Sequence, residues 1–466
     1  MNPRDEQNLQ QALVRSLLTL ENPFAGTDEV IDWVARRNAE VHVAVEEVPF
    51  ADLKGWHFDP VTGNLCHDTG KFFSIVGADV YANNGTEQRW SQPLINQPEV
   101  GYLGIICKVV DGVLYFLLQA KIEPGNVNCV QLSPTLQATR SNYMQVHGGR
   151  KPTYLDYFRF AADDQIVLDQ LQSEQGARFF RKRNRNIIVR VDEVIPPHED
   201  FRWLTLGQIR TLMRHDNLVN MDTRTVLSGL RFKSAPGSGL SGLGTELFAS
   251  EQTEEGVNST DRILHRISAL KSKYELVTEK IPLRDVSDWR VTPTEICRDD
   301  RRFFRVMGVN VTIANREVAS WCQPLVQPMN EGLCVLFAKR IGGVMHVLLQ
   351  AKVECGNFDV VELAPTIQCL TGNYRNPVGY TPHFLQDFLS GSCIEQVVFD
   401  TMQSEEGGRF FREQNRNVFC LVNDSIPDDP PESFIWLTLG QAKEFLRFNN
   451  YLNIQVRSLI SALEYR

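Results

Sequence analysis

The sequence predicts a mixed α/β protein built from two tandem-duplicated domains, and three observations support this. The stretch "LLQAKIEPGNVNCVQLSPTLQATRSNY" from Leu117 returns as "LLQAKVECGNFDVVELAPTIQCLTGNY" from Leu348, 231 residues later. Apolar runs with the composition of strands flank turn dipeptides in both copies. Helix-capping patterns precede helical segments. Together they indicate, in each copy, a hairpin-rich sheet covered by helices.

The repeat extends well beyond this stretch. "WSQPL" from Trp90 matches "WCQPL" from Trp321, and "QSEQGARFFRKRNRN" matches "QSEEGGRFFREQNRN" at the same separation. "WLTLGQ" occurs at Trp203 and again near the end of the chain. A unit of about 200 residues is a whole domain and is too long for a solenoid repeat.

The segment that joins the copies reads "KSAPGSGLSGLGTELFASEQTEEGVNST" and covers residues 233–260. It is rich in Gly, Ser and Glu and poor in periodic apolar residues, which is typical of a linker. We therefore expect a first domain at 1–232, a linker at 233–260 and a second domain at 261–466.

A helix is expected at the start of the first domain and at the end of each domain. "TDEVIDWVARR" has amphipathic spacing, with Thr27 or Asp28 as the N-cap. In "WLTLGQ", Thr205 is the expected N-cap and Gln208, three residues later, its capping-box partner. The second copy repeats this pattern and predicts the same helix start.

Strands are expected between these helices. "LGIICKVVDGVLYFLLQAKIE" consists of two β-rich runs around Asp111-Gly112, a dipeptide that favours a type I′ hairpin turn. Its partner, "LCVLFAKRIGGVMHVLLQAKVE", turns at Gly342-Gly343. "NIIVRVDEV" and "NVFCLVNDSI" predict one further strand in each copy.

Composition excludes several classes of protein. The net charge of −9 argues against general nucleic-acid binding, which requires a basic surface. The first ten residues include the charged Arg4, Asp5 and Glu6, and no apolar run has the length of a signal peptide or a membrane span. Ten cysteines are scattered without a CxxC pair, which favours free thiols in a reducing compartment. We therefore expect a cytoplasmic protein.

Common cofactor motifs are absent from the sequence. No GxGxxG follows a strand, and there is no Walker loop, no GxSxG elbow and no clustered His/Cys pattern. The sequence thus predicts no nicotinamide, no P-loop nucleotide and no zinc.

Polar residues alternate with apolar ones in "QAKxExGN", which both copies keep. On a strand, Gln119, Lys121 and Glu123 share one face because side chains alternate between faces. We favour a polar cavity in which Glu123 and Lys121 transfer protons. The alternative is the solvated end of a hairpin, with an ion pair that contributes little.

The stretch that follows is also polar. Gln137 and Thr139 share a strand face, and Asn142 and Tyr143 enter a turn. Hydroxyl and amide groups at this density suit a sugar or a pyrimidine edge. The alternative is a threonine-rich edge strand. The second copy has Leu370 in place of Thr139.

Arginines recur in "RFFRKRNRN". Arg178, Arg181 and Arg185 have counterparts in the second copy, and their spacing predicts one helical face. The guanidinium fork suits a diphosphate. The alternative is a solvated face with glutamate partners.

Tryptophans recur beside polar loops, at Trp56 and Trp90 in the first copy and at Trp289 and Trp321 in the second. Each is suited to stacking on a base and equally suited to the core.

The paired "LLQAKxExGN…NY" and "QSExGxRFFRxxNRN…WLTLGQ" blocks resemble the nucleoside-diphospho-hexose 2,3-dehydratases of deoxysugar biosynthesis. The resemblance covers almost the whole chain. It implies that each half is a Nudix-like α/β/α sandwich with a mixed sheet. The Nudix box Gx5Ex7REUxEExGU occurs in neither half, so metal-dependent diphosphate cleavage is not expected.

The resemblance also implies the reaction. The family eliminates water from a dTDP-4-keto-6-deoxyhexose, usually dTDP-4-keto-6-deoxyglucose, and yields dTDP-3,4-diketo-2,6-dideoxyglucose. Such an enzyme is a carbon–oxygen lyase (a hydro-lyase) that uses no cofactor and no metal. The resemblance further implies a homodimer and, downstream, an NADPH-dependent 3-ketoreductase that consumes the product. Antibiotic biosynthesis is the expected setting.

Roles within the first half follow from residue chemistry on the matching motifs. Glu123 is the first candidate for proton transfer and Tyr143 the second. Lys121 is expected to donate to the C4 enolate, and His57 is a reserve base. The expected substrate-binding residues are Trp56, Trp90, Gln92, Gln119, Gln137, Thr139, Asn142, Arg178 and Arg181.

A duplicated chain offers two pockets, and the resemblance implies that one is productive and the other a remnant. We expect the productive pocket in the first half, which keeps Thr139, Ser141 and His57. The remnant is expected to bind nucleotide through Trp289, Trp321, Gln350, Lys352, Tyr374, Arg409 and Arg412. Two alternatives are a non-catalytic nucleotide-sugar-binding protein and a metal-dependent nucleotide-sugar hydrolase.

Overall fold

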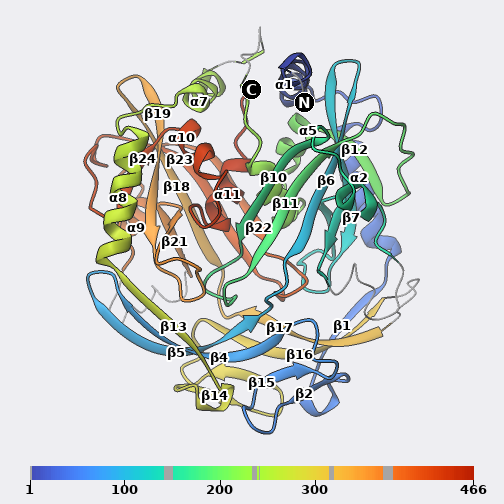
Figure 1. Ribbon diagram of the computed structural model, residues 1–466, viewed down its shortest axis with the longest axis vertical. Helices are drawn as coiled ribbons and strands as arrows, with labels where there is room; N and C mark the ends of the chain where they lie inside the picture. The colour runs from blue at the N-terminus through green and yellow to red at the C-terminus, as the bar shows by residue number, and fades with distance from the viewer. Residues whose placement is uncertain (1–2, 141–150, 234–238, 241, 314–319, 371–380) are drawn as a thin grey trace.

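The computed structural model describes residues 3–140, 151–233, 239–240, 242–313, 320–370 and 381–466. It is a mixed α/β molecule, as the sequence predicts, and it contains two large and two small sheets (Figure 1). The first large sheet holds β10 (Ile166–Ser173), β11 (Arg183–Arg190), β6 (Gly101–Val110), β7 (Val113–Ile122) and β12 (Phe201–Thr205), with β8 (Val130–Ser133) and β9 (Leu136–Ala138) beside β7 and β6. Only the β6–β11 pairing is parallel among the pairings described for this sheet.

The second large sheet repeats this order. It holds β22 (Ile394–Ser404), β23 (Gln414–Val422), β18 (Gly332–Ile341), β19 (Val344–Lys352) and β24 (Phe434–Leu437), with β20 (Glu362–Ala364) and β21 (Ile367–Leu370). Its β18–β23 pairing is parallel as well. Asp111 and Gly112 have φ of 50° and 77°, and Gly342 and Gly343 have 59° and 82°. Positive φ at both turn residues confirms the predicted type I′ hairpins.

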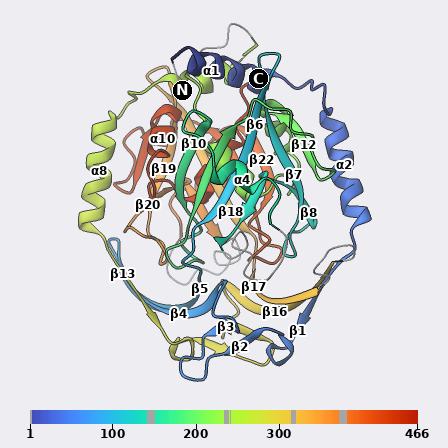
Figure 2. The ribbon, with the colours of Figure 1, turned by 45° about the vertical axis from the view of Figure 1, so that its right-hand side comes forward.

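The two small sheets exchange a strand between the halves. The first consists of β2 (Trp56–Phe58), β3 (Leu65–His67), β4 (Ser74–Asn83) and β5 (Glu87–Asn96), and its edge strand is β13 (Glu275–Ile281) from the second half. The other consists of β14 (Trp289–Val291), β15 (Glu295–Arg298), β16 (Phe304–Ile313) and β17 (Ser320–Pro328), and β1 (Val43–Val48) of the first half pairs with β16. Figure 2 shows β13 against β4 and β1 against β16 on opposite sides of the molecule. Neither half is therefore a separate domain.

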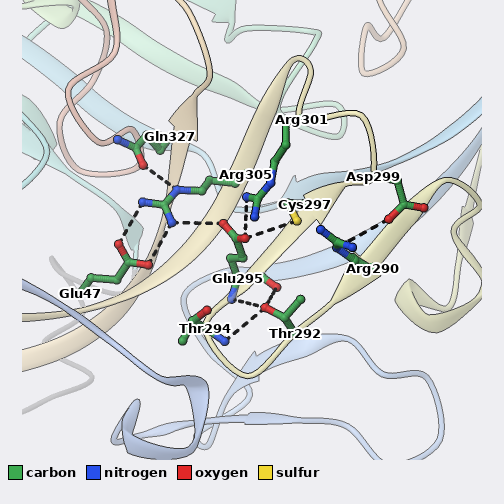
Figure 3. A network of polar contacts seen from close by, with 10 residues as sticks. All are labelled: Glu47, Arg290, Thr292, Thr294, Glu295, Cys297, Asp299, Arg301, Arg305 and Gln327. Carbon is green, nitrogen blue, oxygen red and sulfur yellow. Dashed lines mark hydrogen bonds and ion pairs between the residues drawn. The ribbon is translucent and has the colours of Figure 1, made fainter.

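A polar network holds the exchanged strand β1 in place (Figure 3). Arg305 on β16 binds both carboxylate oxygens of Glu47, at 3.0 and 2.9 Å. The same guanidinium binds Glu295 at 3.1 Å and Gln327 at 2.7 Å. It thus links β1 to three strands of the second half.

Ten helices, counted over the part of the chain that the structure describes, surround and separate the large sheets. They are α1 (Pro3–Leu18), α2 (Thr27–Glu40), α4 (Leu155–Arg159), α5 (Leu206–Leu212), α6 (Met221–Ser228), α7 (Gly242–Gln252), α8 (Thr260–Lys273), α9 (Leu385–Ser390), α10 (Leu439–Phe445) and α11 (Ile454–Ser461). Figure 2 shows α2 and α8 on opposite outer flanks. Of these described helices, none is long and apolar enough to cross a bilayer.

The predicted helix starts are largely confirmed. Thr205 and Thr438 are N-caps, each with a complete capping box to the glutamine three residues later. Helix α2 begins at Thr27 and its N-cap is Gly26, whereas Thr27 or Asp28 was the expected N-cap. The structure thus places this cap one or two residues before the predicted position.

Helices α6 and α11 pack against each other between the large sheets. Each carries a fully buried arginine that reaches into the other half. Arg224 donates to the Ser404 carbonyl, and Arg457 donates to the Ser173 carbonyl at 2.5 Å. The largest apolar core includes residues of both halves, so the two large sheets share one core.

Two expectations about secondary structure were wrong. The segment predicted as a linker contains α7, because Leu247 and Phe248 are buried against the second half. This helix packs on β19 and α10 as α1 packs on β7 and α5. The predicted helical face of arginines is instead a turn followed by β11, and Arg181 has φ of 48°.

Candidate active site

A chain of polar contacts lies at the end of β7. Lys121 donates to Glu123 Oε1 at 2.7 Å, and Gln137 donates to the same oxygen at 2.8 Å. Asn220, the N-cap of α6, donates to Gln137 Oε1 at 3.4 Å. Glu123 Oε2 is buried and has no hydrogen-bond partner among the described residues. Alternation on the strand predicted that Lys121 and Glu123 lie on one face, and the structure adds Gln137 from β9 to them.

The second half repeats the chain at the end of β19. Gln368 donates to Glu354 Oε1 at 3.0 Å, and Asn453 donates to Gln368 Oε1 at 2.7 Å. Lys352 lies 3.9 Å from Glu354 and donates to the Gln368 carbonyl at 2.9 Å. Each half therefore contains one site, called here the first and the second site after the half that holds this chain.

Each site is completed by a turn from the other half. These turns follow β10 and β22 and carry the "QSExG" residues. Gly125, just after Glu123, donates to the Gly407 carbonyl at 2.8 Å, and its counterpart Gly356 donates to the Gly176 carbonyl at 2.6 Å. A Cβ on Gly125 would lie 1.8 Å from the carbonyl oxygen of Phe410. Only glycine allows this approach, which explains the glycine of "ExGN".

The exchange of turns decides which arginine enters which site. Arg409 faces the first site, where Glu406 and Glu123 are among its charged neighbours. Arg178 lines the second site and lies 3.9 Å from Glu413. Each guanidinium also lies over a phenylalanine ring of the half that it enters, Arg409 over Phe73 and Arg178 over Phe304.

The second site contains a cavity of about 220 Å³. Three of its lining residues come from the first half, and the rest come from the second. The lining comprises Gln175, Ala177, Arg178, Phe303, Cys334, Lys352, Glu354, Gln368, Cys369, Leu370, Glu405, Glu413, Asn415 and Gln455.

The first site is rich in titratable groups. Burial, together with the charge of Glu406, raises the pKa of Glu174 to about 7. Burial likewise raises the pKa of Glu406 and of Asp222, and neighbouring carboxylates add to both shifts. Burial lowers the pKa of Lys182. Carboxyl groups that hold protons near neutral pH are suited to acid–base chemistry.

Three substitutions distinguish the second site. Gln175 stands where the first site has Glu406, Glu413 where it has Lys182, and Gln455 where it has Asp222. The second site therefore holds fewer titratable groups. Among the described residues, no cluster of His, Cys, Asp or Glu is placed to hold a metal ion.

The predicted tryptophans do not gather around Glu123. Trp56 is buried and donates to the Cys322 carbonyl at 2.9 Å, which favours the core alternative. Trp90 donates to Gln92, which in turn holds the Ala177 carbonyl beside the second site. The tryptophan on the first-site side is Trp321, because its partner Gln323 holds the Gly408 carbonyl at 3.0 Å.

Other predicted residues lie as follows. His57 is exposed and binds Asp68 at 2.7 Å. Trp289 packs against Phe304. Gln119, Thr139 and Gln350 are half-buried, and the guanidinium groups of Arg181 and Arg412 lie over the neighbouring Phe180 and Phe411 rings. Tyr143, Asn142 and Tyr374 lie outside the described residues.

Sequence reasoning missed several residues of the first site. Glu174 belongs to the repeated "QSE" block and Glu406 directly follows its second copy, where the first copy has Gln175; of this repeat, only the arginines beyond the block were proposed as site residues. Asn220 and Asp222 open the short repeat "NxxxR" that returns at Asn453. The signal was the recurrence of these blocks, but it does not indicate which half they serve.

Comparisons with known proteins agree with this architecture. The profile of the NDP-hexose 2,3-dehydratase family matches residues 27–230 and again 260–463. The chain is 45% identical to a dTDP-4-dehydro-6-deoxy-α-D-glucopyranose 2,3-dehydratase of Saccharopolyspora spinosa, over 98% of this chain and 95% of that protein. Enzymes of the same name from Amycolatopsis orientalis and Streptomyces violaceoruber are 40% and 41% identical, over 99% and 92% of this chain and 95% of each of those proteins. The chain belongs to the NDP-hexose 2,3-dehydratase family.

Proposed function

We infer that this chain is a hydro-lyase that removes water from dTDP-4-keto-6-deoxyglucose and yields dTDP-3,4-diketo-2,6-dideoxyglucose. Full-length identity of 40–45% to three enzymes with this activity in their names supports the inference most strongly. The cluster of buried acids and bases in the first site supports it independently.

The substrate's own ketone makes the reaction feasible. The 4-ketone acidifies the C3 hydrogen, so a base can remove it and leave an enolate. Collapse of the enolate restores the ketone, forms the C2=C3 bond and expels the C2 hydroxyl as water once it is protonated. The resulting enol tautomerises to the 3-ketone. A positioned acid or base contributes about 10²–10⁴ in rate, and one enolate donor about 3–4 kcal/mol.

Glu123 in the first site is the proposed base for the C3 hydrogen. Its Oε1 is held by Lys121 and Gln137, which leaves Oε2 as the atom that faces an acidic hydrogen. Lys121 is the proposed donor to the C4 enolate, because its ammonium group lies beside that base. Tyr143 stays the second candidate for proton transfer.

The exchange of turns changes the proposed diphosphate contacts. Arg409 rather than Arg178 is the arginine beside Glu123, so we assign the diphosphate of the substrate in the first site to Arg409. Trp321 replaces Trp90 as the proposed platform for thymine there. The second site, with Arg178 and Lys352, is the proposed remnant that binds nucleotide.

Further parts of the proposal follow from the resemblance alone. The enzyme needs no cofactor and no metal, works as a homodimer in the cytoplasm and passes its product to an NADPH-dependent 3-ketoreductase. Its setting is the biosynthesis of a deoxysugar of an antibiotic, and each half descends from a Nudix-like sandwich.

A turnover assay tests the activity. The purified protein is incubated with dTDP-4-keto-6-deoxyglucose and EDTA, and a 3-ketoreductase with NADPH traps the unstable product for mass spectrometry. We expect the trapped product to have lost one water and to retain dTDP. Unchanged substrate that still raises the melting temperature would favour a binding protein. Release of dTMP only with magnesium would indicate a hydrolase.

A further inference from the structure

We propose that Glu406, which the second half contributes to the first site, is the general acid that protonates the departing C2 hydroxyl. This assignment rests on the proposed function and names the residue opposite the base. The catalytic pair is then divided between the halves, with Glu123 from one and Glu406 from the other.

The geometry places both carboxyl groups around one small space. A Cβ built on Gly408 would lie 2.7 Å from Glu406 Oε1 and 3.6 Å from Glu123 Oε1. The two oxygens are therefore no farther apart than the sum of those distances. The reaction requires a base at C3 and an acid at the neighbouring C2, so two carboxyl groups facing one hexose ring satisfy it.

The backbone of Glu406 is held in place by hydrogen bonds, whereas its carboxyl group is free to contact a substrate. The backbone amides of Arg409 and Phe410 donate to its carbonyl oxygen, at 3.2 and 3.0 Å. Its side chain is half-buried and makes no hydrogen bond or ion pair within the described part of the chain. Glu174, by contrast, accepts from Asn184 at 2.7 Å and is buried.

The surroundings keep a proton available. The charged groups that act on Glu406 include the cations Arg409, Lys121 and Lys182 and the carboxylate of Glu123. The negative charge of Glu406 also raises the pKa of Glu174 and of Asp222. Carboxyl groups that repel one another in a largely buried site do not all ionise together, so the cluster retains protons at neutral pH.

The protons balance over one turnover. Glu123 takes the C3 proton, and Glu406 gives its proton to the C2 oxygen as the C2–O bond breaks. During tautomerisation, protonated Glu123 returns a proton to C2, and ionised Glu406 takes the proton of the C3 enol. Both side chains end in their starting states, and one water is released.

The second site provides the matched comparison. There Gln175 occupies the position of Glu406, and its amide donates to Glu405, the counterpart of Glu174. The substitution Glu406→Gln therefore gives the first site an arrangement that the chain already folds around. An amide cannot supply the proton.

The test compares two leaving groups. We expect Glu406→Gln to lower kcat for dTDP-4-keto-6-deoxyglucose by about 10²–10⁴. Fluoride leaves without a proton, so we expect the loss in kcat to be only about tenfold or less with the 2-deoxy-2-fluoro analogue as substrate. A fluoride electrode follows the release of fluoride. In D₂O the variant should still exchange the C3 hydrogen, whereas Glu123→Gln should not.

Controls keep the outcomes distinct. Glu279→Gln, at an exposed position of β13, should match the wild type. Equal losses on both leaving groups, or near-normal turnover of Glu406→Gln, would overturn the assignment while leaving the 2,3-dehydratase activity intact. An inactive wild type would instead overturn the proposed function. If Glu406→Gln melts at a lower temperature than the wild type, Glu406→Asp replaces it. This variant keeps a carboxyl group, so we expect it to retain more of the wild-type kcat than Glu406→Gln does. The difference in kcat between the two leaving groups again decides the assignment.

Discussion

The first and second sites share one scaffold and differ in the groups that can move protons. Both hold a glutamate between a lysine and a glutamine, and both receive an arginine from the other half. The first adds Glu406, Lys182 and Asp222, where the second has Gln175, Glu413 and Gln455. On the proposed mechanism, the shared scaffold binds the nucleotide sugar, and the added groups of the first site serve the elimination.

The largest difference is expected from the paired glutamates. Glu123→Gln should lower kcat by about 10²–10⁴, because the base is lost while its hydrogen bonds to the substrate pocket are largely kept. Glu354→Gln should lower it by far less. The steady-state kcat and the dTDP affinity of both variants measure this difference. Equal losses in kcat would show that both glutamates take part in turnover.

The paired arginines should give the next largest effect. Arg409→Lys loses the two-pronged contact to a diphosphate, which is worth about 1.5–3 kcal/mol, and should raise KM about 10- to 100-fold. Arg178→Lys should leave KM nearly unchanged. A rise in KM for Arg178→Lys alone would reverse the assignment of the sites.

The buried acids should make stability fall with rising pH. Burial raises the pKa of Glu405 to about 8, and that of Glu174 to about 7, above the ordinary value of 4.5. Between about 4.5 and these values, the unfolded chain ionises while the folded chain keeps its protons, so the free energy of unfolding decreases.

Substitution separates the two acids. Glu405→Gln should flatten the fall in melting temperature up to about pH 8, and Glu174→Gln only up to about pH 7. Melting curves from pH 5 to 8.5 measure this. Profiles parallel to that of the wild type would mean that these carboxyl groups are ionised in the fold.

The smallest effect is expected at the exchanged strands. Glu47→Gln weakens the pairing with Arg305 that holds β1, and an exposed pair contributes about 1 kcal/mol or less. Its counterpart Lys280 on β13 has no such pairing, because Ser74 stands where the second half has Arg305. The melting temperature should fall by about 2 °C or less for Glu47→Gln and by still less for Lys280→Gln. A larger fall for Lys280→Gln would show that β13 contributes more to stability than β1.

Local patterns in the sequence predicted much of this molecule. The hairpin at Asp111-Gly112, the capping boxes at Thr205 and Thr438, and the grouping of Lys121 with Glu123 all depend on residues close in the chain. Propensity, alternation and turn geometry act over such distances. Helix α7 escaped prediction because its burial depends on the second large sheet.

The sequence by itself thus determined the duplication, the elements of each half and the residues at the end of each central strand. Only the tertiary structure decided that the halves exchange β1, β13 and the two "QSExG" turns. The physical reason lies in the duplication itself. Because the two copies of each turn have nearly the same sequence, no local signal indicates which half a turn will contact. Packing around the shared core makes that choice, and it brings Glu406 rather than Gln175 to Glu123.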